Sequence, residues 1–172
     1  MFSDPASNLA KLGLTDGMKI ADIGAGSGFY SIEAARRVGS SGRVFAIDIQ
    51  KDLLDRLRNA AVAQHIMNIE VVWANAEKIG GTKLREASID RAIASNILFQ
   101  LDKPEDFALE MKRILKPGGK ILIVDWSEVS TVGPKNLFPQ MKAETMFAKN
   151  GFVLDQSFAA GDHHYGLVFT RT

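Results

Sequence analysis

The sequence of 172 residues contains no cysteine. This absence excludes disulfide bonds, cysteine-ligated zinc or iron–sulfur centres, and any thiolate nucleophile. A strong charge of one sign is missing as well, because 21 lysine and arginine residues face 20 aspartate and glutamate residues and leave a net charge of +1. No overall field attracts the chain to nucleic acid, and we expect no nucleic-acid partner.

Long hydrophobic runs are also absent. The longest uninterrupted aliphatic run, Ile121 to Val124, is far shorter than the roughly 20 residues that a membrane-spanning helix requires. Residues 1–5 lack the basic and then apolar pattern of a signal peptide. We therefore expect a cytoplasmic protein without an integral membrane segment, folded as a single domain over 1–172 with a short helical segment at 1–17.

Short apolar runs alternate with longer amphipathic stretches along the chain. The apolar runs predict strands at 18–23, 43–47, 69–73, 89–94 and 120–124. The amphipathic stretches predict helices at 27–38, 52–64 and 103–115. Strands that are apolar nearly throughout and alternate with helices indicate an α/β fold, with a parallel sheet covered on both faces.

The last part of the chain departs from this alternation. The strand-like runs at 152–158 and 165–169 are joined by a connection that is too short for a helix, so we expect them to pair antiparallel. Residues 117–119 (Pro-Gly-Gly) predict a tight turn, and the segment 127–140 is expected to be the least regular part of the chain.

A cluster of glycines follows the first predicted strand. Gly24, Gly26 and Gly28 allow a tight turn at the carboxyl end of that strand, where open parallel sheets bind ligands. Asp48 ends the second predicted strand, and a carboxylate there accepts hydrogen bonds from both hydroxyls of a ribose. The two features together predict a nucleoside site.

The spacing of the glycines bears on which nucleoside is bound. The dinucleotide fingerprint G-x-G-x-x-G requires glycine at position 29, where this chain has Phe29. Asp22 would repel a pyrophosphate and suits a cationic group. A nicotinamide-dependent oxidoreductase is therefore the less favoured alternative, and a ligand with adenine, ribose and a positively charged tail fits better.

Several segments, in this order, resemble the motifs of the class I S-adenosylmethionine-dependent methyltransferases: 22–28, 45–48, 75–77, 90–101 and 115–120. The resemblance extends from about residue 9 to 170, and 124–126 and 165–169 are most similar to the ubiquinone/menaquinone-biosynthesis C-methyltransferase-like group. It implies a Rossmann-like three-layer sandwich whose seven-stranded sheet is mainly parallel with an antiparallel last strand. The implied reaction moves a methyl group from S-adenosylmethionine to a carbon or oxygen of a small-molecule acceptor, leaving S-adenosylhomocysteine.

The resemblance also implies roles for individual residues. Asp22 would balance the ammonium group of the cofactor, Asp48 would hold the ribose, and Ile49 would pack on the adenine. The complete implied cofactor set is Asp22, Gly24, Ala25, Gly26, Gly28, Tyr30, Asp48, Ile49, Asn75, Ala76, Ser95 and Asn96. Asn75 departs from the family, which commonly has aspartate there, and the missing charge weakens one hydrogen bond to adenine.

No acid–base signature stands out in the sequence. Methyl transfer needs a base only when the nucleophile must lose a proton, and Asp125, His163 and His164 are the weak catalytic candidates. No metal site is expected. The missing cysteines exclude a thiolate-based arsenite methyltransferase.

Two further alternatives stay open at this point. The chain is either an active enzyme or a non-catalytic S-adenosylmethionine-binding or regulatory subunit that needs a partner. Little chain precedes the first strand, so the segment 1–17, the loops 127–140 and 159–165, a second copy or a partner protein acting as a lid must read the acceptor.

Overall fold

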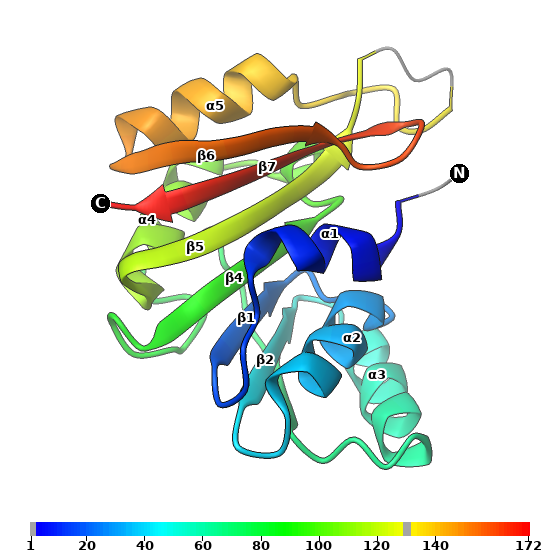
Figure 1. Cartoon of the computed structure of the whole chain (residues 1–172). Helices are drawn as coiled ribbons and strands as arrows, with labels where there is room; N and C mark the ends of the chain where they lie inside the picture. Colours follow the sequence, from blue (N-terminus) through cyan, green and yellow to red (C-terminus); the bar gives the residue numbers. More distant parts are fainter. Residues whose placement is uncertain (1–2, 129–131) are drawn as a thin grey trace.

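Seven strands form one mixed sheet in the computed structural model, which describes residues 3–128 and 132–172 (Figure 1). They lie in the order β3-β2-β1-β4-β5-β7-β6. The strands are β1 (Lys19–Ile23), β2 (Arg43–Asp48), β3 (Ile69–Trp73), β4 (Ile89–Ser95), β5 (Leu115–Trp126), β6 (Phe152–Ala159) and β7 (His164–Arg171). β1 to β5 pair in parallel, and β7 runs antiparallel to both β5 and β6, which confirms the predicted fold class.

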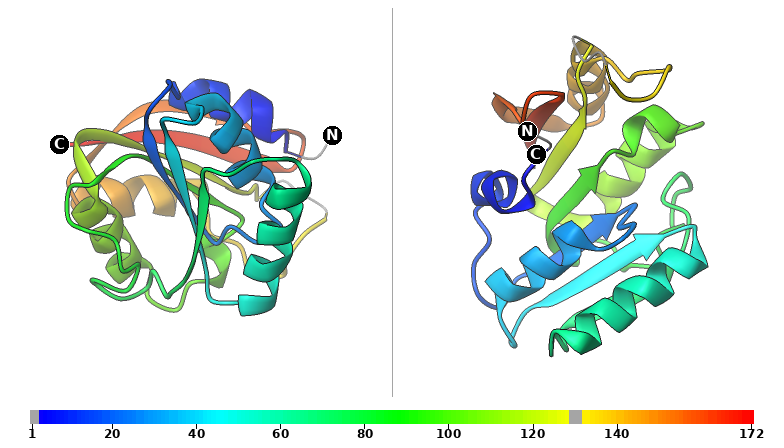
Figure 2. Two further views of the ribbon diagram at one scale, coloured as in Figure 1. Left: turned by 90° about the horizontal axis from the view of Figure 1, so that it is seen from below. Right: turned by 90° about the vertical axis from the view of Figure 1, so that its right-hand side faces the viewer.

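Helices cover both faces of the sheet (Figure 2). Ile20 on β1 shares a buried cluster with Leu9 and Val38, whereas Ile23 on the same strand shares another with Phe107. This division follows from the alternation of side chains along a strand. One face carries α1 (Pro5–Leu12), α2 (Phe29–Val38) and α3 (Lys51–Ala63), and the other carries α4 (Pro104–Ile114) and α5 (Gln140–Lys149).

The first helix is defined by its terminal residues. The carboxylate of Asp4 accepts hydrogen bonds from the backbone N–H groups of Ala6 and Ser7, both at 3.2 Å, and Pro5 stands where its missing N–H is harmless. Gly13 ends the helix in the left-handed conformation, with φ 64°. These caps set the ends of α1, which packs beside α2 and against β5 and β7 (Figure 1).

Two local predictions needed correction. α5 was not predicted. Its apolar pattern consists of only three buried positions, Ala143, Met146 and Phe147, and the helix follows a segment rich in glycine and proline. The turn at 117–119 lies inside β5 rather than before it: the register moves from Ile89 opposite Leu115 to Arg91 opposite Lys120, so the extra residues bulge out of the ladder. Residues 129–131 of the expected irregular segment lie outside the described residues.

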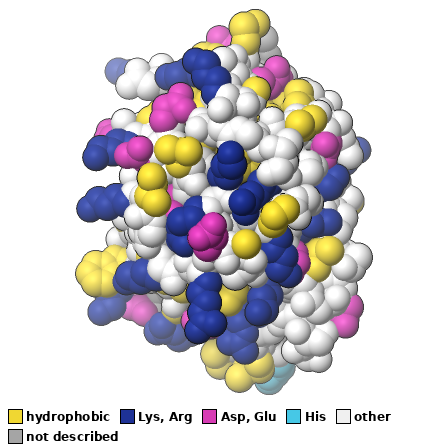
Figure 3. Space-filling view, turned by 90° about the vertical axis from the view of Figure 1, so that its left-hand side faces the viewer, with side chains coloured by type: hydrophobic (Ala, Val, Ile, Leu, Met, Phe, Trp, Pro, Cys, Tyr) yellow, Lys and Arg dark blue, Asp and Glu magenta, His cyan; other side chains and the backbone are white. Residues whose placement is uncertain are grey.

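The strand order creates a switch point between β1 and β4. From β1 the chain continues to β2 and β3 on one side, and then crosses to β4 and β5 on the other. Ligands bind in the crevice that such a reversal leaves at the carboxyl ends of the strands. Figure 3 shows the opposite edge, where the parallel strands begin and where lysine and arginine side chains outnumber acidic ones. Within residues 3–128 and 132–172, no helix is both long and apolar enough to cross a membrane.

Candidate functional site

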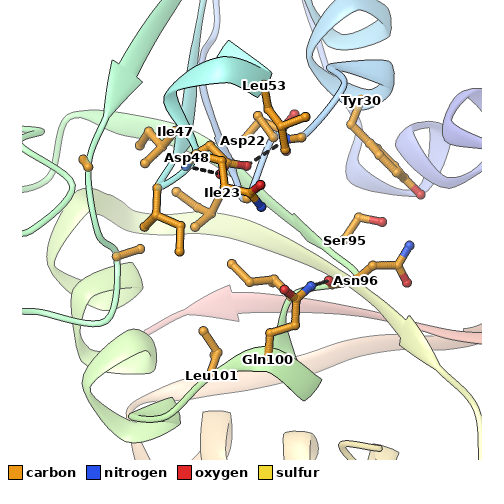
Figure 4. A pocket seen from close by; sticks show the side chains of 18 of the residues that line it. Asp22, Ile23, Tyr30, Ile47, Asp48, Leu53, Ser95, Asn96, Gln100 and Leu101 are labelled. Carbon is orange, nitrogen blue, oxygen red and sulfur yellow. Dashed lines mark hydrogen bonds between the residues drawn. The ribbon is translucent and has the colours of Figure 1, made fainter. Parts of the chain in front are cut away.

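A cavity of about 660 Å³ lies at the carboxyl ends of β1, β2 and β4. Its size suits a ligand of nucleoside dimensions. All but one of the predicted cofactor residues line it: Asp22, Gly24, Ala25, Gly26, Tyr30, Asp48, Ile49, Asn75, Ala76, Ser95 and Asn96. The topology therefore brings together residues from four separate segments of the chain (Figure 4).

The three glycines of the turn differ in what they do. Gly24 has φ 68°, and a Cβ there would lie 2.9 Å from Ile97 Cδ1, so a side chain would both strain the backbone and intrude on the cavity wall. Gly26 has φ 53° and donates its N–H to Asp48. Gly28 is the predicted residue that does not line the cavity: a Cβ there would lie 2.5 Å from Leu57 Cγ, so this glycine lets α2 begin close against α3.

Asp22 is a carboxylate buried at the floor of the cavity, with 2% of its surface exposed. Its Oδ2 accepts a hydrogen bond of 2.6 Å from the Ser31 hydroxyl. Burial raises the pKa of Asp22 to about 6; the Ser31 hydrogen bond opposes this shift and the nearby Asp48 adds to it. A buried carboxylate that meets a hydroxyl and a second acid in place of a cation is a site for a positively charged group.

Asp48 is held rigidly at the end of β2. Its Oδ2 accepts from the Gly26 N–H at 2.9 Å, and its Oδ1 accepts from the Gln50 N–H at 2.8 Å. A carboxylate has about four acceptor positions, so each oxygen keeps one for a further donor. Two oxygens fixed in this way suit the vicinal hydroxyls of a ribose.

The amide oxygen of Asn75 is oriented by a local turn. It accepts the Glu77 N–H at 2.8 Å. An amide oxygen has two lone pairs, so it keeps one acceptor position for the adenine amino group. The departure at position 75 therefore keeps an acceptor and removes only the negative charge that aspartate would bring.

The charged side chains that line the cavity are all acidic among the described residues. Three carboxylates line it, those of Asp22, Asp48 and Glu77, and no lysine, arginine or histidine does so among the described residues. Such a lining favours a ligand that brings positive charge. In the part of the chain that the structure describes, no group of three or more acidic or histidine side chains is arranged to hold a metal ion.

The structure places the three weak catalytic candidates outside the lining of the cavity. Asp125 is fully buried and accepts hydrogen bonds from the N–H groups of Leu98 and Trp126, each at 2.8 Å. Burial raises the pKa of Asp125 to about 6, although these hydrogen bonds act to lower it. Asp125 therefore holds the loop after β4 in place. The ring centroids of His164 and Trp126 lie 4.3 Å apart. Burial lowers the pKa of His164, and the charge of the nearby His163 lowers it further.

Some residues that line the cavity were not named individually from the sequence. Ser3 and Pro5 reach it from the segment 1–17, which was expected to help read the acceptor, whereas no described residue of the loops 127–140 and 159–165 does. Gln100 and Leu101 reach it from the short helix η1 (Leu98–Gln100) and the residue after it. Both lie in the segment 90–101, whose resemblance to a family motif was the sequence signal for them.

The chain is similar to known methyltransferases. A family model for a methyltransferase domain matches residues 14–163. The ubiquinone/menaquinone biosynthesis C-methyltransferase UbiE of Haemophilus ducreyi is 32% identical over 120 residues, which are 67% of this chain and 44% of that protein. Its counterpart in Azotobacter vinelandii is 33% identical over 122 residues, 69% of this chain and 46% of that protein. The chain thus spans less than half the length of these curated relatives.

A solved structure is similar over nearly all of the chain. The crystal structure of an S-adenosylmethionine-dependent methyltransferase from Aquifex aeolicus superposes with a TM-score of 0.90 at 26% sequence identity. The match covers 99% of this chain and 91% of that protein. The two proteins therefore share one fold over nearly their whole lengths.

Proposed function

Because the chain belongs to the class I S-adenosylmethionine-dependent methyltransferases, we propose that it moves the methyl group of S-adenosylmethionine to a carbon or oxygen of a small-molecule acceptor. The single observation that carries the proposal is the cavity at the switch point. It combines a buried carboxylate that has no cationic partner among the described residues, a fixed ribose-type carboxylate and a glycine turn.

The donor set of this cavity fits the cofactor. S-adenosylmethionine supplies a methyl group already activated by its positive sulfur, so the protein contributes position and electrostatics. We assign the ammonium group to Asp22, the ribose to Asp48, and the adenine to Ile49, Asn75 and Ala76. The backbone of Gly24, Ala25, Gly26 and Ser95 completes the site.

The assignment is tested by binding of S-adenosylhomocysteine, measured by isothermal titration calorimetry. Asp48→Ala removes the carboxylate that would hold the ribose, together with its contacts to the N–H of Gly26 in the glycine turn and to the N–H of Gln50 after β2. Gly26→Val places a branched side chain at φ 53°. Each variant is expected to bind at least roughly tenfold more weakly, since a charge-assisted hydrogen bond contributes about 1.5–3 kcal/mol.

The matched control is Asp55→Asn. Asp55 is a half-exposed aspartate on α3 that pairs with Arg58 at 3.1 Å outside the cavity, and the affinity should stay within twofold of the wild type. If Asp48→Ala and Gly26→Val bind as tightly as this control, the assigned site is wrong.

Turnover is tested separately, with S-adenosylmethionine labelled on its methyl group and a panel of phenols, enols and amines. Transfer of label to an extractable product supports an enzyme. Tight binding of S-adenosylhomocysteine without transfer to any member of the panel favours the non-catalytic subunit.

Location and assembly stay predictions. We infer a cytoplasmic protein from the sequence, and either a homodimer or a partner protein as the lid over the cavity. Size-exclusion chromatography with light scattering distinguishes monomer from dimer directly.

A further inference from the structure

The end of the cavity next to α1 carries a cluster of three polar side chains, of which the sequence analysis gave only Tyr30 a role, toward the cofactor. The Nδ2 of Asn8 donates to the Tyr30 hydroxyl at 2.8 Å and to the Ser3 hydroxyl at 2.7 Å. The two hydroxyl oxygens lie 3.1 Å apart. Asn8 is a buried residue of α1, and Ser3 and Tyr30 both line the cavity.

A count of the hydrogen atoms shows that one hydroxyl O–H of this cluster has no acceptor within it. Asn8 has two amide hydrogens, and both are used, one on each hydroxyl. A single hydrogen joins the two hydroxyls, whichever of Ser3 and Tyr30 supplies it. The two hydroxyls have two hydrogens in total, so one O–H remains without an acceptor inside the cluster and is available to the cavity.

A second donor faces the same end of the cavity. Asn96 adopts φ 55°, and its backbone is fixed because its N–H donates to Val124 O at 2.8 Å and its carbonyl accepts from Gln100 Nε2 at 2.7 Å. Its side-chain oxygen is buried without a partner among the described residues, and its amide nitrogen turns to the side on which Tyr30 lies (Figure 4). That nitrogen is the polar atom of the side chain left for a ligand.

We propose that the hydroxyl pair of Ser3 and Tyr30, together with the amide nitrogen of Asn96, binds an oxygen atom of an uncharged acceptor molecule. The acceptor class is a phenol, an enol or a carbonyl compound, because two donors without a positive charge suit a neutral oxygen. The three carboxylates of the cavity exclude carboxylate and phosphate acceptors. This inference rests on the proposed function, and it moves the polar atoms of Tyr30 and Asn96 from the cofactor to the acceptor.

The test uses fluorine NMR on protein loaded with S-adenosylhomocysteine. A single mixture contains para-fluorophenol, para-fluorotoluene and para-fluorobenzoate, which share one ring and differ in the group opposite the fluorine. We expect the phenol to bind at least roughly fivefold more tightly than the toluene, the ratio that one net hydrogen bond of about 1 kcal/mol gives, and the benzoate to bind most weakly.

The variants are Tyr30→Phe and Asn96→Leu. Each should reduce the preference for the phenol to within about twofold, while the affinity for S-adenosylhomocysteine stays within twofold of the wild type. Tyr165→Phe is the matched control, because it removes the other tyrosine hydroxyl, which donates to Phe138 O at 2.9 Å outside the cavity lining. The control should keep the full preference.

Several results would overturn the inference. The phenol binds no better than the toluene, the benzoate binds best, none of the three binds, or the preference survives in both variants. A loss of S-adenosylhomocysteine affinity of more than tenfold in Tyr30→Phe and Asn96→Leu would assign these groups to the cofactor instead. Failure of the wild type to bind S-adenosylhomocysteine is a different result, which contradicts the proposed function itself.

Discussion

Replacing Asp22 by asparagine should stabilise the ligand-free protein and weaken its cofactor site at the same time. The folded state holds the Asp22 proton more strongly than the unfolded chain, because burial raises the pKa of this carboxyl from 3.8 to about 6. Folding is therefore favoured by acid, and the contribution of Asp22 to stability is lost as the pH rises through 6. At about 1.4 kcal/mol for each pH unit, the full effect is about 3 kcal/mol.

Asp22→Asn removes this titration and keeps an oxygen for the Ser31 hydroxyl. Its unfolding free energy relative to the wild type should rise from near zero at pH 4 to about 2–3 kcal/mol at pH 7. The similar titration of Asp125 is present in both proteins and cancels in the difference. The affinity for S-adenosylhomocysteine should fall at the same time, because its ammonium loses the buried carboxylate.

The assay is urea denaturation of the ligand-free proteins at pH 4, 5, 6, 7 and 8, with Asp55→Asn as the exposed control. The control should show a difference within about 0.5 kcal/mol throughout. The reasoning is refuted if Asp22→Asn is no more stable than the wild type at pH 7, or if its advantage is as large at pH 4.

Three further changes test other parts of the structure. Gly28→Ala should lower the unfolding free energy by about 2 kcal/mol in urea denaturation, since it combines φ 84° with a clash against Leu57; an unchanged midpoint contradicts this. Glu110→Ala removes a fully buried carboxylate bonded to Thr82 and should lower the same free energy by about 3–5 kcal/mol, and a loss below about 1 kcal/mol would refute the role. Asn75→Asp adds a negative charge to the acceptor that faces adenine and should tighten S-adenosylhomocysteine binding by roughly fivefold in calorimetry; weaker binding would show that the amide nitrogen serves the ligand.

Much of the fold follows from local pattern. The strands β1 to β5 are apolar runs between glycines and charged residues, and the short connection before β7 forces an antiparallel pair. α5 was missed because its apolar positions are few, and the sheet edge that it covers supplies the rest of its stability.

The parts of the site that the sequence indicated are those formed by residues close together in the chain. The glycine turn and Asp48 are set by neighbours in sequence, so their positions follow from the strands they end. The contact between Ser3 and Tyr30 joins residues 27 positions apart, and no periodicity encodes it. Asp125 stands at the expected strand end, yet Leu98, a residue of another segment, uses its carboxylate.

The carboxylate lining has a consequence for turnover. Donor and spent cofactor differ by the positive charge on sulfur, and a cavity with three acids and no base among its described lining residues responds to that charge. The charged form should lose affinity as ionic strength rises, and the neutral thioether much less. For the proposed methyl transfer, low salt should therefore favour exchange of S-adenosylhomocysteine for fresh S-adenosylmethionine.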